Sequence, residues 1–421
     1  MKSKSKAFDW KPFSDKQLKI MTWWCNKSPV KDKNGIIADG AVRSGKTVSM
    51  AASFMLWAMS NFNECDFAIC GKTVGSLRRN VLGTLKQQAI SLGYDFQERR
   101  TDNLIVISNR DRTNYFYTFG GKDESSQDLI QGMTAAGVLF DEVALMPRSF
   151  VEQAIARCSV EGSKFWFNCN PGAPLHWFNV EWIKQTDKHN VIYLHFTMDD
   201  NLTLSEKMKE RYRSLYSGIF FERYILGLWK SAEGLVYDMF DTERHVIDKP
   251  DEIEFTGNAY ISCDYGTQNP TCFLMWRKYH NKWICVKEYY YDGRAKQKQK
   301  TDSEYADDMI AFIGDTPYTM VIVDPSAASF IAELRKRGIK VQKADNDVLD
   351  GIREVGKLLN LGSLLFTKNC ENAIKEFGVY HWDEKAVERG EDKPAKITDH
   401  AMDAVRYFVY TILHRIVSGH K

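Results

Sequence analysis

The sequence predicts an α/β protein with two sheet-based domains, and three observations lead to that fold class. First, a short apolar strand at Ile36–Asp39 runs through a glycine-containing loop into an apolar helix at Val48–Met59. Second, further short apolar runs end in acidic or amide side chains, which is typical of buried parallel strands whose carboxyl ends carry a site. Third, from Tyr260 onward the pattern restarts in the order strand, hairpin, helix, strand, helix.

Length, charge and cysteine usage limit the classes of function. The 421 residues suffice for two or three domains, and the net charge of +2 creates no overall basic field. Nucleic-acid binding would therefore need local patches, such as Arg78 and Arg79 after the strand Asp66–Cys70, although a solvated helix face explains these arginines equally well. Nine scattered cysteines without a C-x-x-C pair argue against a zinc site and favour a reducing cytosol. The sequence contains no run of eighteen apolar residues, so it predicts no membrane-spanning helix.

The segment that follows the first strand is the most specific motif. It reads G-x-x-x-x-G-K-T, and its members are Gly40, Ala41, Val42, Arg43, Ser44, Gly45, Lys46 and Thr47. In a strand–loop–helix context such a loop cradles phosphate oxygens with its backbone N–H groups. Lys46 is expected to reach the β- and γ-phosphates, and Thr47 to bind Mg²⁺. A glycine-rich turn that matches by chance is the alternative.

A second motif completes this site. Four apolar residues at Gly137–Phe140 lead into Asp141 and Glu142, so two carboxylates are expected at the ligand-binding edge of a parallel sheet. Asp141 would hold Mg²⁺ through water, and Glu142 would polarise the attacking water. A strand that ends in solvated acids is the alternative. Together the two motifs predict an N-terminal P-loop ATPase domain of the ASCE type, with a mainly parallel sheet flanked by helices.

Four further side chains are candidates for the same site. Arg43 inside the loop would offset transition-state charge in cis. Gln17, on a helix capped by Ser14 or Asp15, would read the adenine edge, although a surface glutamine is as plausible. Asn168 and Asn170, which end the apolar run at Phe165, would sense the γ-phosphate; asparagine is also a common turn former.

The second half carries acids at positions that suit a metal-dependent nuclease. Asp264 is the one acid in the predicted strand Tyr260–Gly266, Asp324 follows the apolar strand Thr319–Val323, and Asp399 and Asp403 occupy one face of the last helix. Carboxylates in this order are typical of an RNase H-like site, where two divalent metals roughly 4 Å apart cleave a phosphodiester. Each acid alone is weak evidence, because acids are common at strand ends.

The connection between the halves is predicted to be helical and then irregular. Leu204–Trp229 is rich in Arg, Lys and Tyr with helical spacing, whereas Ala232–Pro250 holds no periodic element. The sequence therefore predicts an ATPase domain at 1–200, a linker subdomain and junction at 201–250, and a nuclease domain at 251–421.

These motifs together resemble the large terminase subunit of tailed double-stranded DNA phages, over nearly the whole chain. The last helix, Asp399–Tyr407, is similar to that family's nuclease helix, D-H-x-x-D-A-x-R-Y. The resemblance places metal carboxylates on Asp264, Asp324 and Asp403, with His400 nearby. One departure is the pair Asn168 and Asn170, where many members carry small hydroxyl residues.

The resemblance also implies an activity and partners. It implies translocation of double-stranded DNA into a procapsid with ATP and Mg²⁺, and DNA cleavage with Mg²⁺ or Mn²⁺ at the start and end of packaging. A portal, a small terminase subunit, a ring of subunits and a location in the host cytoplasm follow from it. Arg148 and Arg157 are candidates for an arginine finger acting in trans.

Two other classes fit the same residues. A DNA helicase or repair ATPase with a degenerate second domain would hydrolyse ATP and grip DNA without cutting it. A nucleotide-switched binding module would bind ATP with negligible turnover. A guanine-specific switch is disfavoured, because no N-K-x-D follows the second motif.

Overall fold

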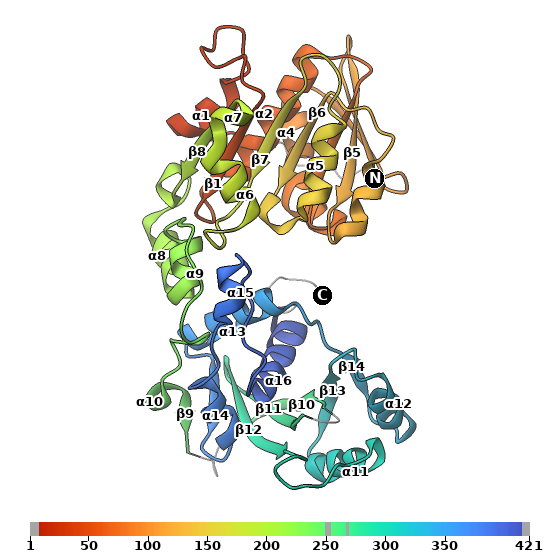
Figure 1. Cartoon of the computed structure of the whole chain (residues 1–421), viewed down its shortest axis with the longest axis vertical. Helices are drawn as coiled ribbons and strands as arrows, with labels where there is room; N and C mark the ends of the chain where they lie inside the picture. The colour runs from red at the N-terminus through yellow and green to blue at the C-terminus, as the bar shows by residue number, and fades with distance from the viewer. Residues whose placement is uncertain (1–7, 249–253, 267–268, 415–421) are drawn as a thin grey trace. The chain divides into compact units, whose positions relative to one another are not determined.

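Two separate sheets organise the chain in the computed structural model, which describes residues 8–248, 254–266 and 269–414 (Figure 1). The chain divides into two compact units. One unit comprises Met1–Arg211 and Phe221–Ser231, and the other comprises Tyr212–Phe220 and Ala232–Lys421. Among the helices described, none is both long and apolar enough to cross a membrane.

An eight-stranded sheet forms the centre of the first unit, in the order β3-β4-β5-β2-β6-β7-β1-β8. Its strands are β1 (Gly35–Gly40), β2 (Asp66–Gly71), β3 (Asp95–Arg99), β4 (Leu104–Ser108), β5 (Thr113–Gly120), β6 (Gly137–Asp141), β7 (Lys164–Asn168) and β8 (Val191–Phe196). Six strands that are neighbours in this order are parallel: β5, β2, β6, β7, β1 and β8. The strands β3 and β4 extend the sheet as an antiparallel edge. The carboxyl ends of the parallel strands therefore meet at one edge.

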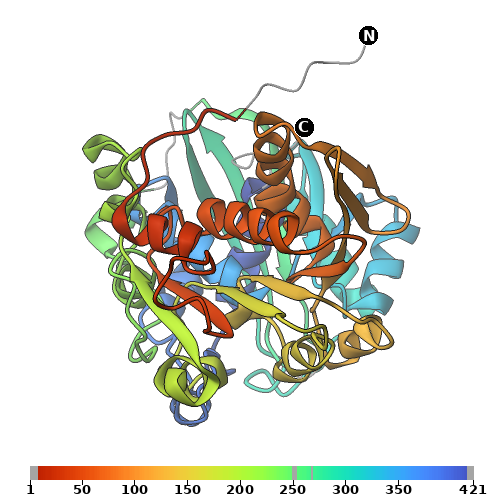
Figure 2. The ribbon, with the colours of Figure 1, turned by 90° about the horizontal axis from the view of Figure 1, so that it is seen from above.

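Helices cover both faces of this sheet. They are α1 (Asp15–Thr22), α2 (Lys46–Asn61), α3 (Val74–Leu77), α4 (Gly83–Ser91), α5 (Arg148–Ala156), α6 (Trp177–Glu181) and α7 (Thr186–His189). Short turns of other helix types lie at η1 (Arg78–Leu82), η2 (Glu124–Ile130), η3 (Val143–Leu145), η4 (Ile183–Gln185) and η5 (Met198–Asp200). Side chains alternate along a strand, so Ile36 and Ile37 of β1 face opposite sides of the sheet. Ile36 belongs to the core with α1, α2 and α4, whereas Ile37 belongs to the core with α5 and α6. Figure 2 shows α1 and α2, in red to orange, on one side of these strands.

The prediction of one helical stretch at Leu204–Trp229 is wrong. Two shorter helices occur there, α8 (Glu206–Leu215) and α9 (Gly218–Tyr224), and the chain is no longer helical by Trp229. The interruption is Tyr216–Ser217, and it is followed by Gly218, whose φ of +50° is a left-handed conformation that glycine adopts readily. The helical spacing predicted the helix type but not the break.

A seven-stranded sheet forms the centre of the second unit, in the order β14-β13-β10-β11-β12-β15-β9. Its strands are β9 (Val246–Ile247), β10 (Thr256–Asp264), β11 (Thr271–Tyr279), β12 (Lys282–Tyr291), β13 (Tyr318–Val323), β14 (Val341–Lys343) and β15 (Leu364–Thr367). As predicted, β10, β11 and β12 form an antiparallel meander. The structure also shows that β13 lies parallel to β10. The carboxyl ends of β10 and β13 therefore lie side by side.

Helices also cover both faces of the second sheet. They are α10 (Thr242–His245), α11 (Asp302–Ile313), α12 (Ala328–Lys336), α13 (Val348–Asn360), α14 (Glu371–Phe377), α15 (Glu384–Glu388) and α16 (His400–Phe408), which continues as the wider turn η6 (Val409–Leu413). The apolar residues of α11 and α12 form one core with β10, β11 and β13. The last helix, α16, packs on the opposite face, where Phe408 stacks on Trp276 with ring centroids 4.6 Å apart.

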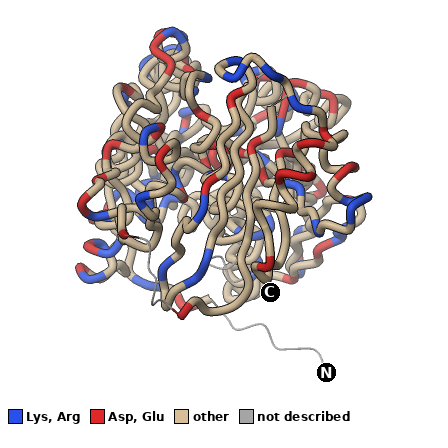
Figure 3. The backbone as a smooth tube through the Cα atoms, turned by 90° about the horizontal axis from the view of Figure 1, so that it is seen from below, with Lys and Arg blue, Asp and Glu red and all other residues tan. Residues whose placement is uncertain are grey.

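The predicted fold class is confirmed in both halves, and the misses are short or polar strands. Neither β3, which is mainly exposed, nor the three-residue β14 has a clear apolar run. In the view of Figure 3, Lys and Arg are interspersed with Asp and Glu along the chain, in keeping with the net charge of +2.

Candidate functional site

The glycine-containing loop lies between β1 and α2, at the carboxyl edge of the first sheet. Gly40 has φ +123°, and a Cβ there would collide with the carbonyl oxygen of Phe196. The N–H of Ala41 donates to that oxygen at 2.8 Å, and the N–H of Val42 donates to Tyr224 O at 2.8 Å. The beginning of the loop is thus fixed by protein contacts, and α2 begins at Lys46 with its positive end at the loop.

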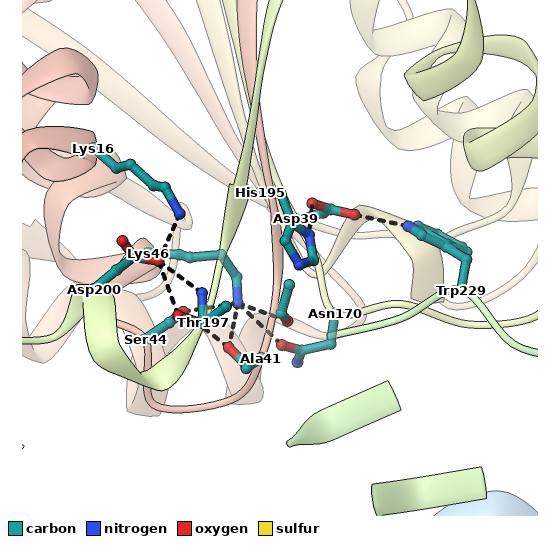
Figure 4. Close-up of polar contacts among 11 residues, drawn as sticks. Lys16, Asp39, Ala41, Ser44, Lys46, Asn170, His195, Thr197, Asp200 and Trp229 are labelled. Carbon is teal, nitrogen blue, oxygen red and sulfur yellow. Dashed lines mark hydrogen bonds and ion pairs between the residues drawn. The ribbon is translucent and has the colours of Figure 1, made fainter. Parts of the chain in front are cut away.

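Lys46 lies at the centre of this loop, 5% exposed (Figure 4). Its Nζ donates to the carbonyl oxygens of Gly40 (3.0 Å) and Ala41 (2.7 Å), and to Ser44 Oγ (3.2 Å) and Asn170 Oδ1 (3.2 Å). Burial lowers the pKa of Lys46, while the negative charge of Glu142 acts in the opposite direction. These four acceptors of the ammonium group are all neutral.

Asp141, at the end of β6, lies next to Thr47. Asn168 Nδ2, from the neighbouring strand β7, donates to Asp141 Oδ1 at 2.7 Å and to Thr47 Oγ1 at 2.8 Å. Thr47 Oγ1 lies 3.4 Å from the same carboxylate oxygen. Burial raises the pKa of Asp141, and the hydrogen bonds from Asn168 and Thr47 oppose that rise. The structure therefore brings together the two predicted Mg²⁺ ligands and one of the two predicted sensor amides.

Glu142 and Lys46 are linked through a single side chain. Asn170 Nδ2 donates to Glu142 Oε1 at 2.9 Å, the Asn170 N–H lies 3.3 Å from Glu142 Oε2, and Asn170 Oδ1 accepts from Lys46. Glu142 itself has φ +60° and ψ +52°, a left-handed conformation that is unfavourable for residues other than glycine. Asn170 therefore contacts both the predicted phosphate-binding cation and the predicted base.

Gln17 and Arg43 both lie near the loop, but Gln17 is buried whereas Arg43 is exposed. Ser14, one of the two predicted caps, begins α1 and forms a capping box with Gln17, whose Nε2 also lies against Gly45. The Arg43 side chain is exposed, and its carbonyl oxygen accepts from Asn201 Nδ2 at 2.7 Å. Sequence reasoning missed Asn201, which follows η5 and has no motif to mark it.

Contacts near the loop show why Gln17 reaches it. Lys16 Nζ pairs with Asp200 Oδ2 at 2.9 Å, and the same oxygen accepts from the N–H of Thr197 at 2.7 Å (Figure 4). This ion pair fastens α1 to the turn that follows β8.

A second buried acid, Asp39, adjoins the loop and was not singled out in the sequence. It is 0% exposed, and its carboxylate contacts His195 Nδ1 at 2.9 Å and Trp229 Nε1 at 2.7 Å (Figure 4). The signal was a charged residue inside the apolar strand β1, since an ionised carboxylate is buried only with partners. Nothing in the sequence identifies those partners.

The two candidates for an arginine finger lie on α5 and at its end. Arg148 pairs with Glu152 and Glu181, each at 2.7 Å. Arg157 is the C-terminal cap of α5. Within the first unit, neither residue belongs to the polar contacts around Lys46 described above.

In the second unit, α16 carries a partner for each predicted metal carboxylate. His400 Nδ1 lies 2.9 Å from Asp264 Oδ2, Arg406 Nη2 donates to Asp403 Oδ1 at 2.8 Å, and Tyr407 Oη donates to Asp324. Asp324 also accepts from the N–H of Ser326 at 2.6 Å. The topology thus brings all four predicted residues to the α16 side of β10 and β13.

Electrostatics shift the pKa values of these acids in different directions. Burial, assisted by the nearby carboxylates of Asp403 and Asp399, raises the pKa of Asp264 to about 6, although His400 acts against that rise. Burial also acts to raise the pKa of Asp324, but hydrogen bonds from Ser326 and Tyr407 bring it below its usual value. For His400, burial is outweighed by Asp264, so that its pKa is raised.

Comparisons with known proteins decide the family. A family profile described as "Terminase large subunit, T4likevirus-type, N-terminal" matches residues 37–244. The large terminase of a thermophilic bacteriophage, in a crystal structure, is 58% identical, with a TM-score of 0.93 over 96% of this chain and 100% of that chain. This chain belongs to the large terminase family.

Two further structures of that thermophilic phage's large terminase contain nucleotides. The complex with ADP is 57% identical and has a TM-score of 0.91, over 95% of this chain and 100% of that one. The complex with ATP-γ-S is 56% identical and has a TM-score of 0.90, over 96% and 100%. Among curated proteins, none matches the chain.

The acids of this terminase are suited to hold divalent metals, although they do not form a closed ligand set. Over residues 8–248, 254–266 and 269–414, no group of three or more His, Cys, Asp and Glu side chains is close enough to hold an ion. Asp264, Asp324 and Asp403 each contact a different side chain of α16. Carboxylate oxygens are nevertheless the donors that Mg²⁺ and Mn²⁺ prefer, and a cation would relieve the repulsion between Asp264 and Asp403.

Glu376, on α14, is a further residue of this region that sequence reasoning missed. It is 2% exposed and accepts from the N–H groups of Ala401 (2.7 Å) and Met402 (3.2 Å) and from Tyr290 Oη (2.9 Å). Burial raises the pKa of Glu376 to about 7. Because Asp399 makes no side-chain cap, Glu376 supplies the carboxylate at the start of α16.

Proposed function

We propose that this terminase hydrolyses ATP in its first unit to drive double-stranded DNA into a procapsid, and cleaves DNA in its second unit. The observation that carries the proposal is the convergence of Lys46, Thr47, Asp141 and Glu142 at the carboxyl edge of one parallel sheet. The nucleotide complexes of the thermophilic phage's large terminase support ATP as the substrate.

In the proposed hydrolysis, the residues act in two groups. The N–H groups of the loop at Arg43, Ser44 and Gly45 and the start of α2 bind the phosphates, together with Lys46. Thr47 and Asp141 would hold Mg²⁺, which neutralises phosphate charge when bound. Gly40 permits the turn into the loop, and the amide of Gln17 would contact the adenine.

The chemical step requires a base at the water molecule. Glu142 accepts the proton of the attacking water, and the Arg43 side chain, exposed at the loop, offsets charge that develops on the phosphate.

Asn170 provides a physical route for coupling. When Lys46 binds phosphate instead of loop carbonyls, its contact with Asn170 Oδ1 is lost, and the Asn170 amide can then release or re-aim Glu142. Asn168, at the end of β7, similarly contacts both proposed Mg²⁺ ligands, Thr47 and Asp141. The two amides would therefore report the phosphate state to the chain after β7.

For DNA cleavage, we propose Asp264, Asp324 and Asp403 as ligands of two Mg²⁺ or Mn²⁺ ions, with His400 beside them. Metals held there would supply an activated water and would stabilise the leaving oxygen. His400 orients Asp264, Arg406 orients Asp403 and Tyr407 orients Asp324. These three contacts support the proposal that the second unit cleaves DNA.

The proposal extends to organisation and partners. We assign 1–200 to the ATPase domain, 201–250 to a linker and 251–421 to the nuclease domain. Double-stranded DNA, a portal on the procapsid and a small terminase subunit are the proposed partners, with a ring of subunits working in the host cytoplasm.

The decisive experiment is ATP-dependent protection of DNA from an added nuclease, with procapsids that carry a portal. Protection that needs ATP and disappears in Lys46→Ala supports a packaging motor. ATP hydrolysis stimulated by DNA, without protection and without metal-dependent cutting, would instead favour a helicase-type ATPase whose second unit only grips DNA.

A further inference from the structure

The chain segment Phe221–Ser231 packs directly against the phosphate-binding loop. Tyr224 O accepts the N–H of Val42 at 2.8 Å. Gly227 lies so close that a Cβ there would come within 2.9 Å of Ala41 N and 3.1 Å of Gly40 Cα. Trp229 Nε1 donates to Asp39 at 2.7 Å. Four consecutive residues, 39–42, at the end of β1 and the beginning of the loop, thus lie against one short segment.

The same segment also contacts the chain that follows the sensor amides. The N–H of Lys230 donates to Gly172 O at 3.2 Å, two residues after Asn170. The Trp229 ring lies near His176, with centroids 6.0 Å apart. The segment therefore contacts both the phosphate-binding loop, next to Lys46, and the chain after β7, which carries Asn170.

Its internal contacts hold the segment together. Arg223, 4% exposed, donates from Nε to Lys230 O at 2.9 Å and so closes a loop between α9 and the end of the segment. Leu228 N–H donates to Glu222 O at 3.0 Å. A short loop closed in this way is expected to respond to a displacement as one piece.

Asp39 is the strongest point of attachment. Its carboxylate is fully buried and receives Trp229 from the segment and His195 and Tyr193 from β8. Hydrogen bonds to a buried charge are stronger than neutral ones, and losing one leaves the charge under-solvated. Asp39 immediately precedes Gly40, so its position is tied to the loop backbone.

We infer that Asp39 and Trp229 form a latch through which the nucleotide state of the phosphate-binding loop acts on Phe221–Ser231, the segment that leads into Ala232 and the rest of the second unit. This inference rests on the proposed ATP-dependent function. Asp39 is a positioning residue, because it acts through the loop and through Trp229. Neither residue belongs to the phosphate-binding or metal-binding set proposed above.

Hydrogen exchange of the full-length chain tests the latch, with ATP-γ-S and Mg²⁺ as the probe. In the wild type, the probe should slow exchange both in peptides covering 39–47 and in peptides covering 221–231, by on the order of tenfold at the hydrogen-bonded amides. Trp229→Phe keeps an aromatic ring and removes the indole N–H. In this variant, the loop should still be protected, while the response of 221–231 is lost.

Trp24→Phe is the matched control. It removes an indole hydrogen bond of the same unit, to Ser53 Oγ at 3.1 Å, away from the loop, and should behave as the wild type. Loop protection without any response of 221–231 in the wild type would overturn the latch and leave the proposed function standing. A full response of 221–231 in Trp229→Phe would also overturn it. If the probe protects no part of the wild-type loop, the proposed ATP binding fails, and the latch fails with it.

Discussion

The two acid-bearing sites of this terminase are built in different ways. In the first unit, Lys46 and Thr47 are consecutive, as are Asp141 and Glu142, and the orienting groups are neutral amides. In the second unit, the acids are spread over residues 264 to 403 and are oriented by His400, Arg406 and Tyr407 from one helix. The first arrangement is suited to an anion, because it offers backbone N–H groups and a cation, and the second gathers negative charge suited to cations.

The largest expected effects test whether the first site works alone. Lys46→Ala and Glu142→Gln should each abolish ATP hydrolysis, measured as phosphate release; loss of a general base alone costs about 10²–10⁴-fold. Glu142→Gln should still bind ATP, because the phosphate-binding groups remain. DNA cleavage by both variants should match the wild type. Turnover by Glu142→Gln near the wild-type rate would assign the base elsewhere.

The converse substitutions test the second site. Asp264→Asn, Asp324→Asn and Asp403→Asn should each remove metal-dependent cutting of double-stranded DNA, because each replaces a charged ligand by an amide. Double variants should lose little more, since the residues act as one site. ATP turnover should survive in all of them. Asp399→Asn, one turn before Asp403, is the control with a smaller loss; cutting that persists in all three would leave the second unit as a DNA-gripping module.

Glu376 sharpens the contrast through stability rather than activity. The pKa of Glu376 in the folded protein is about 7, above the ordinary 4.5. Protonated Glu376 therefore contributes to the free energy of unfolding in full below pH 4.5, and this contribution is lost as the pH rises through 7. That loss amounts to about 3 kcal/mol at most. Glu376→Gln, which never ionises, should therefore gain stability relative to the wild type between pH 5 and pH 8, as measured by denaturant titration. A difference independent of pH would show that burial does not penalise this carboxylate.

The smallest effect concerns the neutral amides of the first site. Asn170→Ala removes the link between Lys46 and Glu142, and ATP turnover should fall about tenfold, the value of one well-placed hydrogen bond. ATP affinity should change less than the turnover rate, because the loop is intact. A purely structural role would instead lower the melting temperature and leave the turnover of the folded fraction unchanged.

This comparison also explains how much was predictable from the sequence. The phosphate-binding loop and the pair Asp141 and Glu142 are contiguous, so their chemistry can be recognised from a few adjacent residues. Asp264, Asp324 and Asp403 needed the order of strands, together with a family resemblance. Glu376 and Trp229 carry no motif, because their partners are determined by packing of distant segments. The break just before Gly218 was missed because helical periodicity does not encode backbone φ.

The position of β1 has a consequence for biosynthesis. Among the strands described, this fully buried one pairs only with β7 and β8, so that Gly35 meets Phe165 about 130 residues later in the chain. At ribosomal rates of 5–20 residues per second, β1 and the loop after it wait roughly ten seconds for a first partner strand. During that interval an apolar strand with unpaired edges is open to misassociation. The nascent terminase is thus expected to depend on holding factors until residue 196 has left the exit tunnel.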